Sequence, residues 1–138
     1  MNPVYTATAH STGDGRNGHA RSDDGFIDLD LRIPKEMGGP GGGTNPEELF
    51  AAGYAACFHS ALKLIAGQQK LDVNGTEVSA SIGIGPLADG GFGLTAALVI
   101  YAPTLDQATA QSLVDAAHQV CPYSRATRGN ISVELRVL

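Results

Sequence analysis

The sequence predicts one α+β domain whose elements follow the order βββ-α-ββ-α-β. Segments with the alternating pattern of strands come before, between and after two segments with helical periodicity. The longer helical segment, residues 46–69, is about twice the length of an average globular helix, which indicates a central place in the core. No repeat or long linker divides the 138 residues, a length typical of a single domain spanning 1–138.

Composition excludes several classes of function. The net charge is −5 and no basic run is present, which argues against a nucleic-acid partner. The N-terminal residues lack the basic and apolar parts of a signal peptide, and no segment was expected to be apolar enough to cross a membrane. We therefore expect a cytoplasmic protein with no membrane partner. In that reducing compartment a disulfide is usually catalytic or redox-sensing.

The N-terminal third predicts a three-stranded antiparallel meander. Its strands are expected at residues 4–10, 19–22 and 26–33, and the glycine-rich turn 13–18 joins the first two. The following loop, residues 34–43, is rich in glycine but lacks the Gly-Lys-Ser/Thr ending of a phosphate-binding loop. We therefore expect it to be a flexible connection.

The remaining elements have clear end signals. Asn45 and Pro46 suit the N-cap and first position of the long helix, and Gly53 inside that helix marks close packing or a kink. A hairpin is expected from residues 77–84 and 92–101. A second helix runs from Asp106 to about residue 120 and is ended by Pro122, and residues 131–137 alternate as a closing strand.

The two cysteines allow three interpretations. Cys57 lies on the apolar face of the long helix, where a cysteine is usually an inert small hydrophobe. With His59, His118 and Cys121 it also forms a nominal Cys₂His₂ metal set. Against that set, residues two apart on a helix point about 200° apart. The third interpretation is a reactive thiol pair.

A reactive pair requires a cation or helix N-terminus that lowers the pKa of the nucleophilic thiol. Cys57 is well inside its helix, so the helix dipole helps little and Arg16, on the glycine-rich turn, is the candidate cation. Glu47 can be an ordinary first-turn acid, which is the commoner use of glutamate at that position. Composition and spacing leave these interpretations open.

Four stretches match motifs of a known family. They are GRNG (15–18), TNPEELFAAGYAACF (44–58), GGFGL (90–94) and AHQVCPYSRATRGNI (117–131). Together they resemble the organic hydroperoxide resistance family, part of the osmotically inducible protein superfamily, and the match runs in register over essentially the whole chain. The CPYS context of the second cysteine favours the organic hydroperoxide branch.

The resemblance implies a cofactor-free thiol peroxidase that reduces organic hydroperoxides, fatty-acid hydroperoxides among them. Cys57 matches the peroxidatic cysteine and Cys121 the resolving one. Arg16 matches the arginine that holds the thiolate and polarises the peroxide, and Glu47 the acid that orients this arginine. The family forms intertwined homodimers and is recycled by dihydrolipoyl groups on lipoylated proteins.

Two structural expectations accompany these roles. Phe50, Tyr54 and Phe58 are candidates for an apolar substrate wall, although a place in the core is the favoured explanation for any one of them. Glu47 and Cys57 are ten residues apart, about 15 Å along a straight helix, so one Arg16 can hardly contact both within one chain. We therefore expect either a helix interrupted near Gly53 or, preferably, a site shared between subunits.

Overall fold

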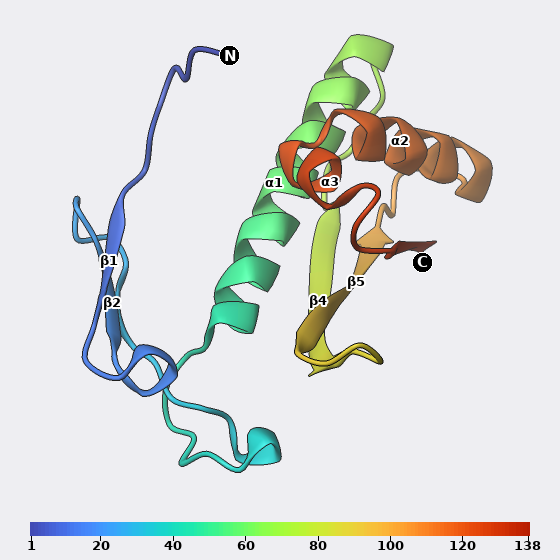
Figure 1. Ribbon diagram of the computed structural model, residues 1–138. Coiled ribbons are helices and arrows are strands. Elements are labelled where there is room, and N and C mark those ends of the chain that lie inside the picture. Colours follow the sequence, from blue (N-terminus) through green and yellow to red (C-terminus); the bar gives the residue numbers. More distant parts are fainter. The chain divides into compact units, whose positions relative to one another are not determined.

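The computed structural model describes residues 1–138 and divides into two compact units, Met1–Leu49 and Phe50–Leu138. The order of strands and long helices matches the predicted βββ-α-ββ-α-β arrangement, with one short helix added before the last strand (Figure 1). The α+β class is confirmed. That residues 1–138 form one domain stays a prediction.

The first unit is a small antiparallel sheet with almost no core. Its strands are β1 (Ala9–Thr12), β2 (His19–Ser22) and β3 (Asp28–Asp30), in the order β1-β2-β3. Short 3₁₀ helices occupy Gly15–Asn17 (η1) and Lys35–Met37 (η2). The meander is confirmed, but its first strand begins five residues later than predicted, at Ala9. Leu31 is the unit's single buried hydrophobic residue. The residues before Ala9 are exposed, so their weak alternation of apolar and polar side chains does not mark a strand with one buried face.

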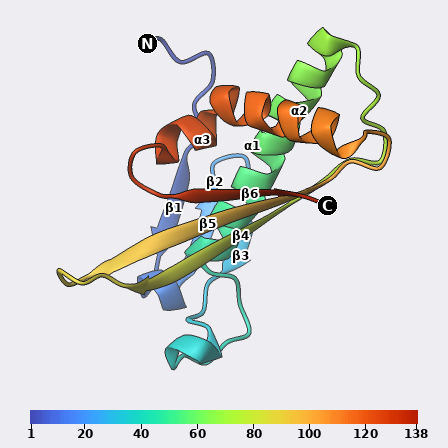
Figure 2. The ribbon, with the colours of Figure 1, turned by 90° about the vertical axis from the view of Figure 1, so that its right-hand side faces the viewer.

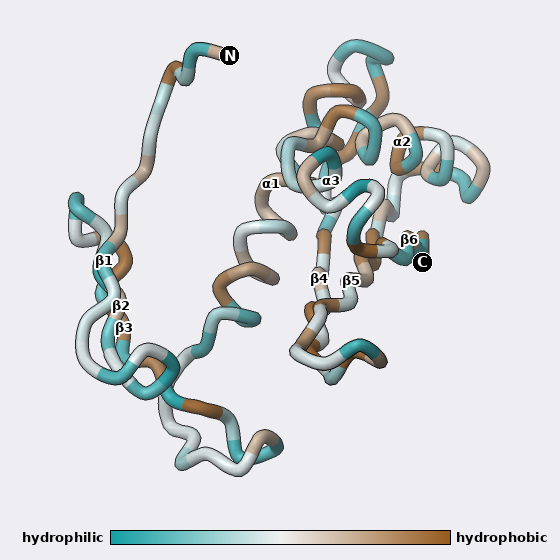
Figure 3. Tube along the Cα trace, viewed as in Figure 1, coloured by the Kyte–Doolittle hydropathy of each residue, from teal (hydrophilic) through white to brown (hydrophobic).

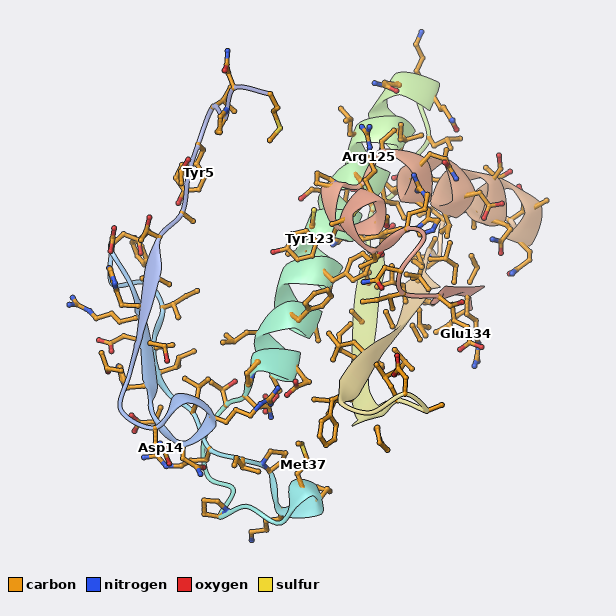
Figure 4. All side chains as sticks on the ribbon, in the orientation of Figure 1. Tyr5, Asp14, Met37, Tyr123, Arg125 and Glu134 are labelled. Atoms are coloured by element: carbon orange, nitrogen blue, oxygen red, sulfur yellow. The ribbon has the colours of Figure 1, made fainter.

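The long helix α1 (Pro46–Gln69) has the predicted bounds and is unbroken. Asn45 caps it in both directions, because its Oδ1 accepts a 2.8 Å hydrogen bond from the Glu48 N–H and its Nδ2 donates a 3.0 Å bond to Glu48 Oε1. Gly53 marks close packing rather than a kink. A Cβ placed there would lie 3.0 Å from the Tyr123 hydroxyl, whose ring lies beside α1 (Figure 4).

The second unit contains a three-stranded sheet and two further helices. The strands β4 (Glu77–Pro86) and β5 (Phe92–Tyr101) form the predicted hairpin, and β6 (Val133–Val137) pairs with β5 in parallel. Helix α2 (Gln107–Val120) is capped by Asp106, which accepts a 2.9 Å hydrogen bond from the Thr109 N–H. The short helix α3 (Pro122–Thr127) follows directly, and Figure 2 shows it continuing from the end of α2.

One face of α1 supplies much of the core of the second unit. Figure 3 shows hydrophobic segments along α1, β4 and β5, and the buried residues of α1 are Tyr54, Phe58, Ala61, Leu62, Ile65 and Ala66. Contrary to the sequence expectation, α1 is long and apolar enough to cross a membrane, with a mean hydropathy of 1.4 over its best window. Its packing against the sheet and α2 identifies it as a core helix.

Candidate active site

The structure brings the two cysteines together. Cys57 lies in the middle of α1, and Cys121 is the single residue between α2 and α3. Their Sγ atoms are 3.7 Å apart, both thiols are free, and Cys121 is fully buried whereas Cys57 is half-buried. A disulfide requires about 2.05 Å between sulfurs, so a small shift is enough to close this pair.

The surroundings of Cys57 in the second unit favour the neutral thiol. Burial raises the pKa of the Cys57 thiol, the backbone N–H of Tyr123 partly offsets this, and the neighbouring Cys121 raises the pKa further. Tyr123 belongs to the first turn of α3, and sequence reasoning did not identify it as a donor to Cys57. No cation is among the groups that set this pKa, so a thiolate at neutral pH requires one from elsewhere.

In the first unit, Arg16 and Glu47 form a bidentate ion pair. Arg16 Nη1 donates to Glu47 Oε2 and Nη2 donates to Oε1, each at 2.8 Å. The Arg16 side chain is 37% exposed and that of Glu47 is 12% exposed. The guanidinium holds the pKa of the Glu47 carboxyl below its ordinary value, and the carboxylate raises the pKa of Arg16. The pair fixes the direction of the guanidinium.

Neighbouring residues hold the turn that carries Arg16. Arg32 Nη1 donates to the Gly18 carbonyl at 3.0 Å, and Asn17 Oδ1 accepts a 3.0 Å hydrogen bond from the Ile33 N–H. A Cβ at Gly18 would lie 2.2 Å from the Thr12 carbonyl oxygen, so glycine is required there. The sequence analysis identified neither Arg32 nor Asn17, because contacts across 14 to 16 positions of the chain have no local signal.

Replacing Glu47 with glutamine tests the strength of this ion pair. The pKa of the Glu47 carboxyl is lower in the folded protein than its ordinary value of 4.5, which applies to the unfolded chain. The ion pair therefore stabilises the fold fully above that ordinary value, and this stability is lost as the pH falls through the lower pKa of the folded state. We expect Glu47→Gln to reduce the free energy of unfolding at pH 7 by about 1 kcal/mol, allowing for the exposure of Arg16. Urea unfolding of both proteins between pH 7 and pH 3 measures this difference in the free energy of unfolding.

Because the substitution removes this titration, the variant and the unmodified protein should converge in stability at the acid end. Glu36→Gln is the matched control, since Glu36 makes no ion pair. An equal loss in stability at every pH would contradict the assignment to the charge pair.

The predicted substrate-wall residues lie in or beside the core. Tyr54 and Phe58 are fully buried, and Phe50 is half-buried. The rings of Phe50 and Tyr54 lie 6.0 Å apart, and both pack against Tyr123, at 5.9 and 5.8 Å between centroids. Core packing therefore accounts for Tyr54 and Phe58, and their contact with substrate stays a prediction.

The nominal Cys₂His₂ set is not assembled. No group of three His, Cys, Asp or Glu side chains is placed to hold a metal ion. His118 Nδ1 instead lies 2.8 Å from Ser124 Oγ, and the buried Nε2 of His59 has no hydrogen-bond partner.

Comparison with known proteins places the chain in a family. Residues 39–136 match the model of the OsmC-like protein family. The organic hydroperoxide resistance protein of Xanthomonas axonopodis pv. citri is 56% identical over 96% of this chain and 93% of its own. A crystal structure of an organic hydroperoxide resistance protein from Elizabethkingia anophelis superposes with a TM-score of 0.93 at 50% identity, covering 99% of this chain and 98% of that one.

A similar structure carries a ligand. A putative organic hydroperoxide resistance protein from Vibrio cholerae, with captopril bound in one of its active sites, superposes with a TM-score of 0.93 at 47% identity, covering 99% of this chain and 94% of that one. Full-length similarity at this level, together with a close cysteine pair, leads to one conclusion: this chain belongs to the OsmC-like family, as an organic hydroperoxide resistance protein.

Proposed function

We propose that the protein is a thiol peroxidase that reduces organic hydroperoxides, including fatty-acid hydroperoxides, to alcohols. The observation that carries this proposal is the 3.7 Å separation of Cys57 and Cys121, free thiols from sequence positions 64 residues apart. The names of the relatives support organic hydroperoxides as the substrate class. Defence against organic peroxide stress follows from that activity.

The reaction uses both thiols and is balanced without a bound cofactor. The Cys57 thiolate attacks the distal peroxide oxygen, the O–O bond breaks, and the proximal oxygen leaves with a proton as the alcohol. Cys57 is left as a sulfenic acid. Cys121 then attacks the Cys57 sulfur, which forms the Cys57–Cys121 disulfide and releases water. The hydroperoxide thus accepts the two electrons that the thiols lose.

Arg16 and Glu47 are proposed to activate this step. Burial and Cys121 raise the pKa of Cys57, so a permanent cation is needed to stabilise its thiolate and the alkoxide that develops on the leaving oxygen. Arg16 is the proposed cation, and Glu47 orients it through the bidentate pair. Both roles rest on the family resemblance and on this pair.

We also propose an intertwined homodimer in which each site draws on both subunits. The first unit has one buried hydrophobic residue, Leu31, among 49 residues, too little core for independent stability. Helix α1 is continuous through Gly53, which removes the alternative of an interrupted helix. A second copy of the chain would supply the missing apolar partner.

Substrate preference and recycling complete the proposal. Phe50 and Tyr123 belong to the aromatic cluster beside Cys57 and are not fully buried. They would form an apolar wall, with the buried Tyr54 and Phe58 behind them. Such a wall would favour alkyl hydroperoxides over hydrogen peroxide. The disulfide is reduced by exchange with dihydrolipoyl groups on lipoylated proteins. The working compartment is the cytoplasm, where thiols are kept reduced.

A recycling assay tests this function. The protein is supplied with dihydrolipoamide and either a fatty-acid hydroperoxide or hydrogen peroxide, and the oxidation of dihydrolipoamide is followed. We expect turnover of the fatty-acid hydroperoxide to be at least about tenfold faster, because an apolar wall contributes binding only to the alkyl chain. Equal rates would contradict the substrate class, and no oxidation with either peroxide would contradict the peroxidase itself.

A further inference from the structure

A chain of hydrogen bonds in and beside the core links α1, which carries Cys57, with α2 and α3, the two helices on either side of Cys121. Tyr54 Oη of α1 lies 2.9 Å from Ser124 Oγ of α3, and Ser124 Oγ lies 2.8 Å from His118 Nδ1 of α2. Tyr54 and Ser124 are fully buried, whereas His118 is half-buried. Neither the Tyr54 hydroxyl nor Ser124 nor His118 has a part in the chemical steps proposed above, in which only the ring of Tyr54 is used, behind the apolar wall. We refer to Tyr54, Ser124 and His118 as the hydroxyl–imidazole chain.

Each member is three positions from a cysteine. Tyr54 precedes Cys57 by three residues on α1, so the two side chains share a helix face. His118 precedes Cys121 by three residues and Ser124 follows it by three. The hydroxyl–imidazole chain therefore lies beside the thiol pair and connects the segment of one cysteine with that of the other.

The segment around Cys121 is held by core packing and by a small number of hydrogen bonds. Cys121 is the only non-helical residue between α2 and α3, with φ −58° and ψ 123°. Its N–H donates to the Ala117 carbonyl and its own carbonyl accepts from the Arg125 N–H, so each bond ties it to one helix. Two side-chain contacts span this junction. Arg128 Nη2 donates to the His118 carbonyl at 2.7 Å on the exposed side, and His118 Nδ1 meets Ser124 Oγ on the side of the core.

The three groups satisfy one another in a consistent donor order. Burial, followed by the charge of Arg128, lowers the pKa of His118, which favours a neutral ring. The Tyr54 hydroxyl can then donate to Ser124 Oγ, and the Ser124 hydroxyl can donate to His118 Nδ1. Removing the Ser124 hydroxyl leaves the buried Tyr54 hydroxyl with only its 3.4 Å contact to Thr127 Oγ1.

We propose that Tyr54, Ser124 and His118 are positioning residues that hold Cys121 within reach of Cys57, and that they thereby determine whether the Cys57 sulfenic acid becomes a disulfide or is oxidised further. The inference rests on the proposed peroxidase function. The sulfurs must approach from 3.7 Å to about 2.05 Å, and a misplacement of about 1 Å can slow such a step by up to about 10²-fold.

The competing reaction consumes a second hydroperoxide. The sulfenic acid takes its distal oxygen to become a sulfinic acid, and a second alcohol is released. This step depends on hydroperoxide concentration, whereas attack by Cys121 does not. A slower attack by Cys121 therefore appears as more sulfinic acid when hydroperoxide is in excess, with no change in the first oxidation of Cys57.

Ser124→Ala provides the test, because it removes both contacts of the hydroxyl–imidazole chain at once. Single-turnover mixing with a fatty-acid hydroperoxide separates loss of the Cys57 thiol from loss of the Cys121 thiol. We expect the first rate to stay within about twofold and the second to fall about tenfold. With excess hydroperoxide, mass spectrometry of the Cys57 peptide should show more sulfinic acid. Ser60→Ala is the control, since Ser60 bonds only the Ala56 carbonyl on the exposed side of α1.

Two further variants keep the test decisive if Ser124→Ala does not fold. His118→Ala removes one contact at a half-buried position, and His118→Asn retains a polar atom near the place of Nδ1. We expect His118→Ala to increase sulfinic acid and His118→Asn to restore disulfide formation. A sulfinic acid yield that is unchanged in every folded variant would overturn the inference. A wild-type protein that loses neither thiol would instead overturn the peroxidase function.

Discussion

Replacing Cys57 with serine is expected to reduce hydroperoxide consumption by at least about 10³-fold. A serine hydroxyl has no accessible anion at neutral pH and cannot form the sulfenic acid, so the first step is lost entirely. Peroxide consumption in the presence of dihydrolipoamide measures the effect. The substitution exchanges sulfur for oxygen at a half-buried position, so the fold should be retained, as circular dichroism can confirm.

Cys121→Ser is the matched control because it removes the other thiol of the same pair. It should oxidise Cys57 at close to the normal rate, consume a second hydroperoxide as the sulfenic acid becomes a sulfinic acid, and then stop. Sustained turnover by Cys57→Ser, or a lost first step in Cys121→Ser, would reverse the proposed roles of the two cysteines.

Replacing Arg16 with lysine is expected to slow the first oxidation of Cys57 by about 10²-fold. Lysine keeps the charge but cannot make the two parallel hydrogen bonds that Arg16 makes to Glu47. The ammonium would therefore be poorly aimed at the thiolate and at the alkoxide that develops on the leaving oxygen. Stopped-flow measurement of thiol loss at several pH values gives both the rate and the apparent pKa of Cys57, which we expect to rise.

Arg21→Lys is the control for a general effect of surface charge. Arg21 is on strand β2 of the same unit, and its Nε lies 3.7 Å from Asp28 Oδ2 in an exposed pair. Its substitution should leave the rate and the pKa of Cys57 unchanged. An Arg16→Lys variant with an unchanged first rate would show that another group activates the thiol.

The elements with strong local signals could be predicted from the sequence. Asn45 and Pro46 fixed the start of α1, and the hairpin β4–β5 followed from its alternation and its glycine turn. The first strand was misplaced because an exposed sheet imposes little pattern on its residues. Helix α3 was missed because Pro122 was interpreted only as the end of α2. Proline is equally suited to the first position of a new helix.

The site was only partly accessible from sequence. Family motifs identified the cysteines and the pairing of Arg16 with Glu47, which joins residues 31 positions apart and has no local signal. No motif identified the contact between Tyr54 and Ser124, 70 positions apart. Periodicity assigned Tyr54 to an apolar face, but it cannot show that the hydroxyl at the end of the ring meets a buried serine.

The most direct test of the central claim is a single turnover with stoichiometric products. Reduced protein receives one equivalent of a fatty-acid hydroperoxide per chain, and the alcohol formed is measured together with a peptide map of the protein. The account predicts one alcohol per chain and a disulfide linking the Cys57 and Cys121 peptides, which dihydrolipoamide then reverses. Two free thiols and intact hydroperoxide at the end of the incubation would contradict it.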